Sequence, residues 1–158
     1  MQVNLDNSFR VRELQVLFKP TRFKSPATIG SPQDVLSFLR PMLKNQPRER
    51  LISIALHSGN QVVGFEIVSQ GTANTSLAYA SEVFKAVLLT NSTAFILAHN
   101  HPSGNCEPSL EDRQIAERIS KAAELIGIKL LDFLIVTEDS FYSFAQSEPS
   151  ILNKGGEL

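Results

Sequence analysis

The spacing of apolar residues changes along this chain, and each spacing predicts an element of secondary structure. Leu14, Val16 and Phe18 occupy alternate positions, which is typical of a strand that ends at Pro20. The polar stretch 57–60, between two later apolar runs, has the composition of a hairpin turn. Short apolar runs predict further strands at residues 51–56, 62–68, 94–98, 130–136 and 141–144.

Three other segments repeat apolar residues at intervals of three and four, which predicts helices at residues 31–43, 81–89 and 109–126. The first opens on Ser31-Pro32, an N-cap followed by proline at the first helical position. Strands and helices mixed in this order predict an α/β fold, in which helices cover a mixed sheet.

The organisation along the chain predicts one folded unit with a short extension at each end. A length of 158 residues suits a single domain. We expect an N-terminal arm at residues 1–9, a domain at 10–145 and a flexible polar tail at 146–158. The pair Gly155-Gly156 is interpreted as part of this tail rather than as a processing signal.

Composition and charge narrow the class of protein. Hydrophobic residues make up 42% and charged residues 20% of the chain, as in ordinary globular proteins. The net charge of −1 gives no global argument for a nucleic-acid or membrane surface, although a local basic patch is compatible with it. The only cysteine, Cys106, suits a reducing compartment. We find no signal-peptide core and no apolar run near the ~20 residues that span a bilayer, so we expect a cytoplasmic protein.

Two of the three histidines, His99 and His101, stand one residue apart at the end of the apolar run 94–98. Side chains alternate along a strand, so both imidazoles would lie on one face and could point at one metal ion. Asp112, in the first turn of the helix that follows, would supply a third ligand, and zinc accepts such a mixture. Alternatively, Ser109 and Asp112 form only a helix-capping pair.

The stretch AHNHPSGNCEPSLED, residues 98–112, carries a more specific signal. His99-Asn100-His101, seven residues, Ser109, two residues and Asp112 resemble the H-x-H-x7-S-x2-D signature of the JAB/JAMM (MPN+) metalloprotease superfamily, in its RadC-like branch. The resemblance extends over residues 10–145 and implies a JAB/MPN-like (cytidine deaminase-like) fold. It also implies zinc held by the two histidines and Asp112, with Glu49 as general base.

These residue types suggest how a peptide or isopeptide bond in a peptide or protein substrate would be hydrolysed. Zinc lowers the pKa of bound water toward ~7. Glu49 would take a proton from that water, with Glu66 as a competing base. The hydroxyl of Ser109 could stabilise an oxyanion, cap the helix, or do both.

Other polar residues have simpler interpretations. Cys106 is expected to be an ordinary loop residue, and His57 an exposed turn residue. Asp132 could orient a ligand histidine, although we favour a structural role. Chains of the RadC-like branch usually have histidine where this chain has Phe133. The helix–hairpin–helix segment that often precedes such domains is not found in this sequence.

Three functions are compatible with these observations: a zinc-dependent hydrolase, which we favour, a DNA-repair-associated protein that interacts with nucleic acid, and a metal-binding module without turnover. The sequence leaves the oligomeric state open.

The second of these functions leads to a testable expectation. Because neutralised phosphates release counterions, a protein that binds duplex DNA directly loses affinity steeply as salt increases. With a net charge of −1, we expect weak or no duplex binding at physiological salt. Titration of labelled duplex at several salt concentrations tests this expectation, and tight, strongly salt-dependent binding would favour the nucleic-acid function.

Overall fold

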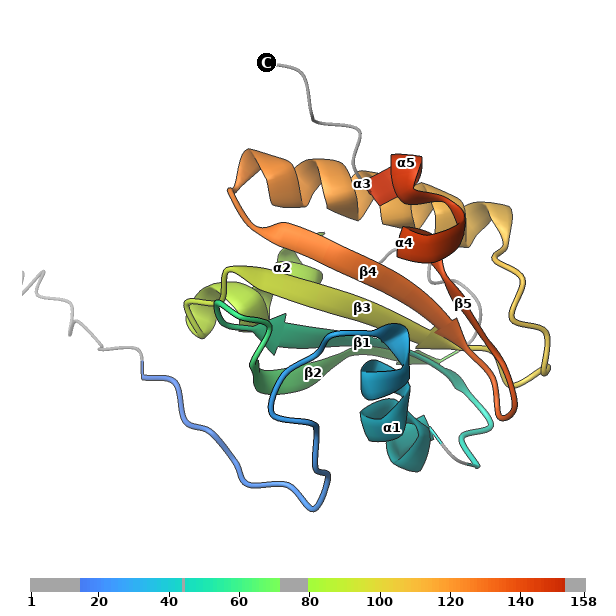
Figure 1. Ribbon diagram of the computed structural model, residues 1–158, viewed down its shortest axis with the longest axis horizontal. Helices are drawn as coiled ribbons and strands as arrows, with labels where there is room; N and C mark the ends of the chain where they lie inside the picture. The colour runs from blue at the N-terminus through green and yellow to red at the C-terminus, as the bar shows by residue number, and fades with distance from the viewer. Residues whose placement is uncertain (1–14, 44, 72–79, 153–158) are drawn as a thin grey trace, which may run out of the picture.

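A mixed sheet of five strands forms the centre of the molecule in the computed structural model, which describes residues 15–43, 45–71 and 80–152 (Figure 1). The spatial order is β2-β1-β3-β4-β5. Strands β3 and β4 are parallel, and the other neighbouring pairs are antiparallel. The strands are β1 Glu49–Leu56, β2 Val62–Gly71, β3 Ala94–Asn100, β4 Lys129–Val136 and β5 Phe141–Ser143.

Helices cover both faces of this sheet, which confirms the predicted α/β fold of a single domain (Figure 1). Helix α1 packs against one face, and the other four helices pack against the opposite face. Helix α2 begins one residue before the predicted cap, so Ser81 lies in its first turn. Among the described residues, none of the helices has the length and apolarity needed to cross a membrane. The helices are α1 Pro32–Leu43, α2 Ala80–Leu89, α3 Leu110–Leu125, α4 Phe144–Ser147 and α5 Pro149–Leu152.

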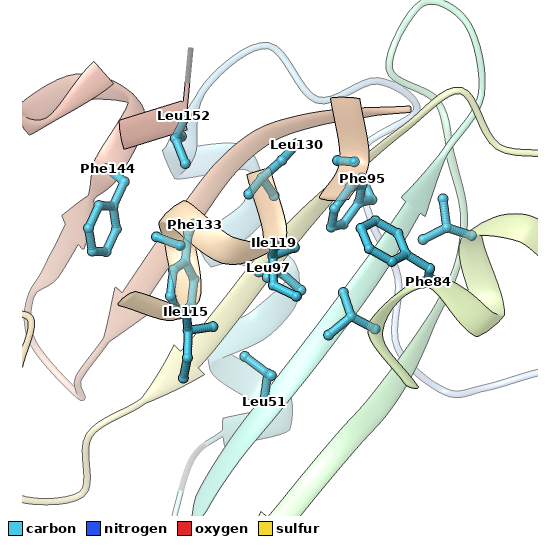
Figure 2. Close-up of a cluster of buried hydrophobic side chains, with 14 of the residues drawn as sticks. Leu51, Phe84, Phe95, Leu97, Ile115, Ile119, Leu130, Phe133, Phe144 and Leu152 are labelled. Carbon is cyan, nitrogen blue, oxygen red and sulfur yellow. The ribbon is translucent and has the colours of Figure 1, made fainter. Parts of the chain in front are cut away.

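Alternation along the central strands divides the core into two layers. In β1, Ile52 and Ile54 face α1, whereas Leu51 faces the side of α2 and α3. Strand β3 alternates in the same way, and Phe95 and Leu97 join the layer that Figure 2 shows. Because both faces of these strands are covered, their sequences are continuous apolar runs rather than alternating ones. The same alternation sets the face on which the later residues of β3 lie.

The predicted strand at residues 14–18 is wrong for the residues that the structure describes; Leu14 lies outside them. Residues 15–18 belong to no strand, and Val16, Leu17 and Phe18 are exposed. Alternation predicts a strand only where a neighbouring strand can accept its hydrogen bonds. Within ranges 15–43, 45–71 and 80–152, none of the strand pairings includes residues 15–18.

The predicted flexible tail is also wrong over residues 146–152. Phe144 already begins α4, so β5 ends one residue earlier than predicted, and α5 follows directly. Phe144 is fully buried, where its ring stacks on that of Phe133 at a centroid distance of 5.3 Å. Leu152 packs in the same layer (Figure 2). These buried contacts order a segment whose polar composition favoured a tail. The pair Gly155-Gly156, together with the predicted arm at residues 1–9, lies outside the described residues.

A buried hydrogen bond offers a test of this corrected C-terminal segment. The hydroxyl of Ser120, on α3, donates to the backbone oxygen of Leu152 at 2.7 Å. Ser120→Ala leaves that oxygen without its partner, so we expect the free energy of unfolding to fall by about 1 kcal/mol. Urea unfolding measures the loss, with the exposed Ser37→Ala as a control for serine removal. An unchanged stability would contradict the docking of α5 on α3.

Candidate metal centre

The end of β3, the start of β1 and the start of α3 meet at one end of the sheet. Leu51 of β1 pairs with His99 of β3. Glu49 lies two residues before Leu51, so it is on the same face of the sheet as His99. This is the face that α3 covers, and the first turn of α3 carries Asp112. Residues distant in the sequence are therefore brought to one place by strand pairing and by the 101–109 loop.

Three side chains at this end could hold a metal ion. One ligand atom from each of Glu49, His99 and His101 lies within 4.8 Å of the others. Oε2 of Glu49 is 3.6 Å from Nε2 of His99. The side chain of His99 is 3% exposed, that of His101 13% and that of Glu49 26%. The group is therefore buried at His99 and reaches solvent beside Glu49.

Asp112, the third ligand expected from the sequence, contacts both histidines, but among the described residues it is not one of the three side chains of the group that could hold an ion. Its Oδ1 lies 3.1 Å from Nδ1 of His99, and its Oδ2 lies 3.5 Å from Nε2 of His101. Oδ2 also accepts hydrogen bonds from the backbone N–H and the hydroxyl of Ser109, at 2.8 and 2.6 Å. Asp112 thus both closes the capping box of α3 and orients the histidines.

The hydrogen bonds at Nδ1 leave Nε2 as the lone-pair nitrogen of each neutral imidazole, and Nε2 of His101 lies beside Oδ2 of Asp112. Nδ1 of His101 lies 2.8 Å from the backbone oxygen of Asn105, which can only accept, so Nδ1 carries the proton. Ionised Asp112 likewise requires the proton of His99 on Nδ1. Nε2 of His99 is buried and has no hydrogen-bond partner among the residues that the structure describes. A buried nitrogen lone pair without a hydrogen-bond donor is unfavourable, and a bound cation would provide the missing partner.

Two pKa shifts follow from these contacts. Burial alone would raise the pKa of Asp112, but hydrogen bonds with His101, His99 and Ser109 hold that pKa well below its usual range. The hydrogen bond with Asp112 raises the pKa of His101, and burial opposes this shift. The carboxylate is therefore ionised at neutral pH, which is the state that binds a metal ion.

The residues present fit a metal ion of the zinc type. Nitrogen and oxygen atoms that share a tetrahedral zinc ion at bond lengths of about 2.0–2.1 Å lie about 3.4 Å apart. The separation between Glu49 and His99, 3.6 Å, and that between His101 and Asp112, 3.5 Å, are close to this value. Imidazole and carboxylate together suit zinc and several other divalent metals. Asn105, whose carbonyl fixes the ring of His101, was not singled out in the sequence because a backbone contact leaves no residue-type signal.

Ser109 is the N-cap of α3, which confirms the capping interpretation. Its hydroxyl accepts from the backbone N–H of Asp112 at 3.1 Å and donates to the carboxylate of Asp112 at 2.6 Å. The hydroxyl has a single proton, which it donates in the hydrogen bond to Asp112. A role for Ser109 toward an oxyanion therefore requires this bond to be released.

The weaker candidates lie apart from the metal group or outside it. Glu66 sits opposite Ser53, in the middle of β2, and forms an ion pair with Lys85 at 3.0 Å. His57 is exposed and follows the far end of β1, in the confirmed hairpin turn. Within the described residues, Cys106 is not a member of the group that could hold an ion.

Asp132 has a structural role in this fold. Its oxygens accept from the hydroxyl of Ser143 at 2.6 Å and from the backbone N–H of Ala145 at 2.9 Å. Burial raises the pKa of Asp132, and these hydrogen bonds oppose the rise. The contacts join β4 to the start of α4 rather than orienting a histidine. Phe133 is a fully buried core residue.

Comparison with known proteins gives a family. The profile of the RadC-like JAB domain matches residues 29–149. A UPF0758 protein of Pseudomonas fluorescens is 38% identical over 125 residues, which cover 79% of this chain and 56% of the relative. One from Rubrobacter xylanophilus is 40% identical over 130 residues, covering 82% and 56%. One from Methanosarcina mazei is 34% identical over 149 residues, covering 90% and 65%.

The matched region bears directly on the site. The chain spans about half the length of the first two relatives, 56% of each. Residues 29–149 nevertheless include every strand of the sheet and all the side chains of the candidate metal centre. Since fold, motif and family match coincide, this chain belongs to the RadC-like JAB domain family.

Proposed function

We propose that this chain is a zinc-dependent hydrolase that cuts an amide bond in a peptide or protein substrate. The observation that carries the proposal is the buried, unpartnered Nε2 of His99 beside the carboxylate of Glu49. In this proposal His99, His101 and Asp112 hold the metal, and Glu49 acts as the base. These are the roles that the family resemblance implies for the four residues.

Zinc, when bound, would polarise a carbonyl oxygen and make water acidic enough to attack near neutral pH. The chain's own residues would do the rest. Asp112 and the Asn105 carbonyl hold the two imidazoles in one tautomer, which presents both Nε2 atoms. Glu49 is the most exposed of the four side chains, so it would be the one to meet an incoming molecule and exchange protons with it.

The proposed class of substrate, a peptide or protein, is based on the partial exposure of the metal group beside Glu49. An amide in an extended peptide or in a side-chain-linked isopeptide could approach from the side of Glu49. The relatives are longer than this chain. The substrate and partners of a longer protein that contains this domain are therefore part of the same proposal. A cytoplasmic location, which the single cysteine suits, is also proposed.

Metal content and hydrolysis test this function together. Purified protein is analysed for bound metals, then stripped with a chelator and reloaded with zinc, cobalt or magnesium. We expect about one zinc per chain, and hydrolysis of a peptide or isopeptide library that disappears on stripping and returns with zinc. Absence of metal from the folded protein would contradict the proposal. Bound zinc without hydrolysis of any library member would favour a metal-binding module.

A further inference from the structure

The residue between the two histidines faces away from them and reaches the neighbouring strand. Asn100 is 5% exposed. Its side-chain Oδ1 accepts from the backbone N–H of Arg50 at 2.7 Å. Its Nδ2 donates to the backbone oxygen of Arg48 at 3.2 Å. One amide side chain thus binds the two peptide groups on either side of Glu49.

This contact lies where β3 leaves β1. The pairing of the two strands ends at Leu51 and His99. Beyond that point β3 continues to pair with β4, as Asn100 is opposite Val136, and the backbone N–H of His101 donates to the Val136 oxygen at 2.9 Å. The Asn100 side chain therefore replaces backbone pairing at the point where the two strands part.

We propose that Asn100 is a positioning residue that holds Glu49 in place at the metal centre. The inference rests on the role proposed for Glu49 above. Fixing the peptide groups before and after Glu49 restricts rotation of its backbone on both sides, which limits where its carboxylate can lie. Glu49 is paired with Gly71 of β2 on one side, and on the β3 side, where ladder pairing has ended, Asn100 supplies the contact.

The chemistry of the contact requires an amide side chain. One acceptor and one donor are needed, in a fixed relative orientation, to bind an N–H and a C=O at once. Aspartate has the shape but places a second acceptor against the Arg48 oxygen. Alanine leaves two partly buried backbone groups without this partner.

Amide exchange in the metal-free protein tests the contact itself. The Arg50 N–H is expected to exchange about tenfold faster in Asn100→Ala than in the wild type, relative to amides in the middle of β1. Asn100→Asp keeps the acceptor, so Arg50 should remain protected. Ser53→Ala is the matched control, because it removes a buried hydrogen bond from the same strand, that of its hydroxyl to the Val83 oxygen. Equal Arg50 exchange in wild type and Asn100→Ala would overturn the proposal.

Cobalt spectroscopy tests the consequence for Glu49. Co²⁺ is loaded into the full chain, and the pH midpoint of the change in its visible spectrum is measured for the wild type, Asn100→Ala, Glu49→Gln and the double variant. We expect Asn100→Ala to move the midpoint in the same direction as Glu49→Gln, by about one pH unit, as when a neighbouring charge is displaced. In the Glu49→Gln background, Asn100→Ala should then have no further effect.

The outcomes separate the two proposals. The positioning role would be overturned if the two midpoint shifts add in the double variant. It would also be overturned if Glu49→Gln moves the midpoint and Asn100→Ala does not. Should Asn100→Ala fail to fold, the uncharged Asn100→Ser passes through the same cycle, and a shift that persists in full without Glu49 would overturn the positioning role too. Absence of Co²⁺ binding in the wild type, or a midpoint unmoved by Glu49→Gln, contradicts the proposed function instead, and amide exchange then judges the Asn100 contact alone.

Discussion

Replacing Glu49 with glutamine is expected to reduce turnover by about 10²–10⁴-fold while zinc stays bound, since general acid–base catalysis contributes that much. Glutamine keeps the shape of the side chain but cannot accept a proton. The three proposed ligands are untouched, so the metal content should stay at about one per chain. Steady-state hydrolysis of a library substrate and metal analysis of the same preparation measure both quantities.

Glu66→Gln is the matched control for this experiment. Glu66 carries the same side chain, but its carboxylate pairs with Lys85 and lies in the middle of β2. We expect its loss to change turnover little. Loss of zinc from Glu49→Gln would make Glu49 a ligand, as its distance of 3.6 Å from the His99 nitrogen permits. Full turnover in Glu49→Gln would remove it from the reaction.

The second large effect concerns the ligands themselves. His99→Ala and Asp112→Ala are expected to weaken zinc binding by more than about a hundredfold, because even residues that only orient ligands contribute 10–100-fold. Both side chains are buried, each 3% exposed. Competition with a chromogenic chelator measures the dissociation constant for each variant.

Asp112→Ala also removes a helix cap, so its effect needs a separate control. Ser109→Ala removes the hydroxyl partner in the capping box but leaves the Asp112 carboxylate, and it should cost about 1 kcal/mol of stability with a smaller effect on zinc. His57→Ala, in the exposed turn, should change neither quantity. If both His99→Ala and Asp112→Ala retained zinc fully, the ligand assignment would be wrong.

Local sequence was sufficient for most of the fold. Continuous apolar runs identified the buried strands, since β1 and β3 are covered on both faces and have no polar face to display. The Ser109–Asp112 spacing located the start of α3 to the residue, because a capping box is made within one helical turn. The local patterns gave wrong predictions at residues 15–18 and 146–152. Contacts with distant parts of the chain order residues 146–152. Residues 15–18 pair with none of the described strands.

The candidate metal centre, like the fold, was determined partly by local sequence and partly by tertiary structure. The sequence by itself determined that His99 and His101 share a face and that Asp112 lies in the first turn of the next helix, because a strand of period two and a short loop leave few other arrangements. Only the tertiary structure decided which carboxylate joins them. The register that pairs Leu51 with His99 brings Glu49 to the metal group and leaves Glu66 opposite Ser53. Strand register and the contact of Asn100 with the 48–50 backbone depend on packing between segments about 50 residues apart, as both Asn100 hydrogen bonds show, and no local pattern encodes such a distance.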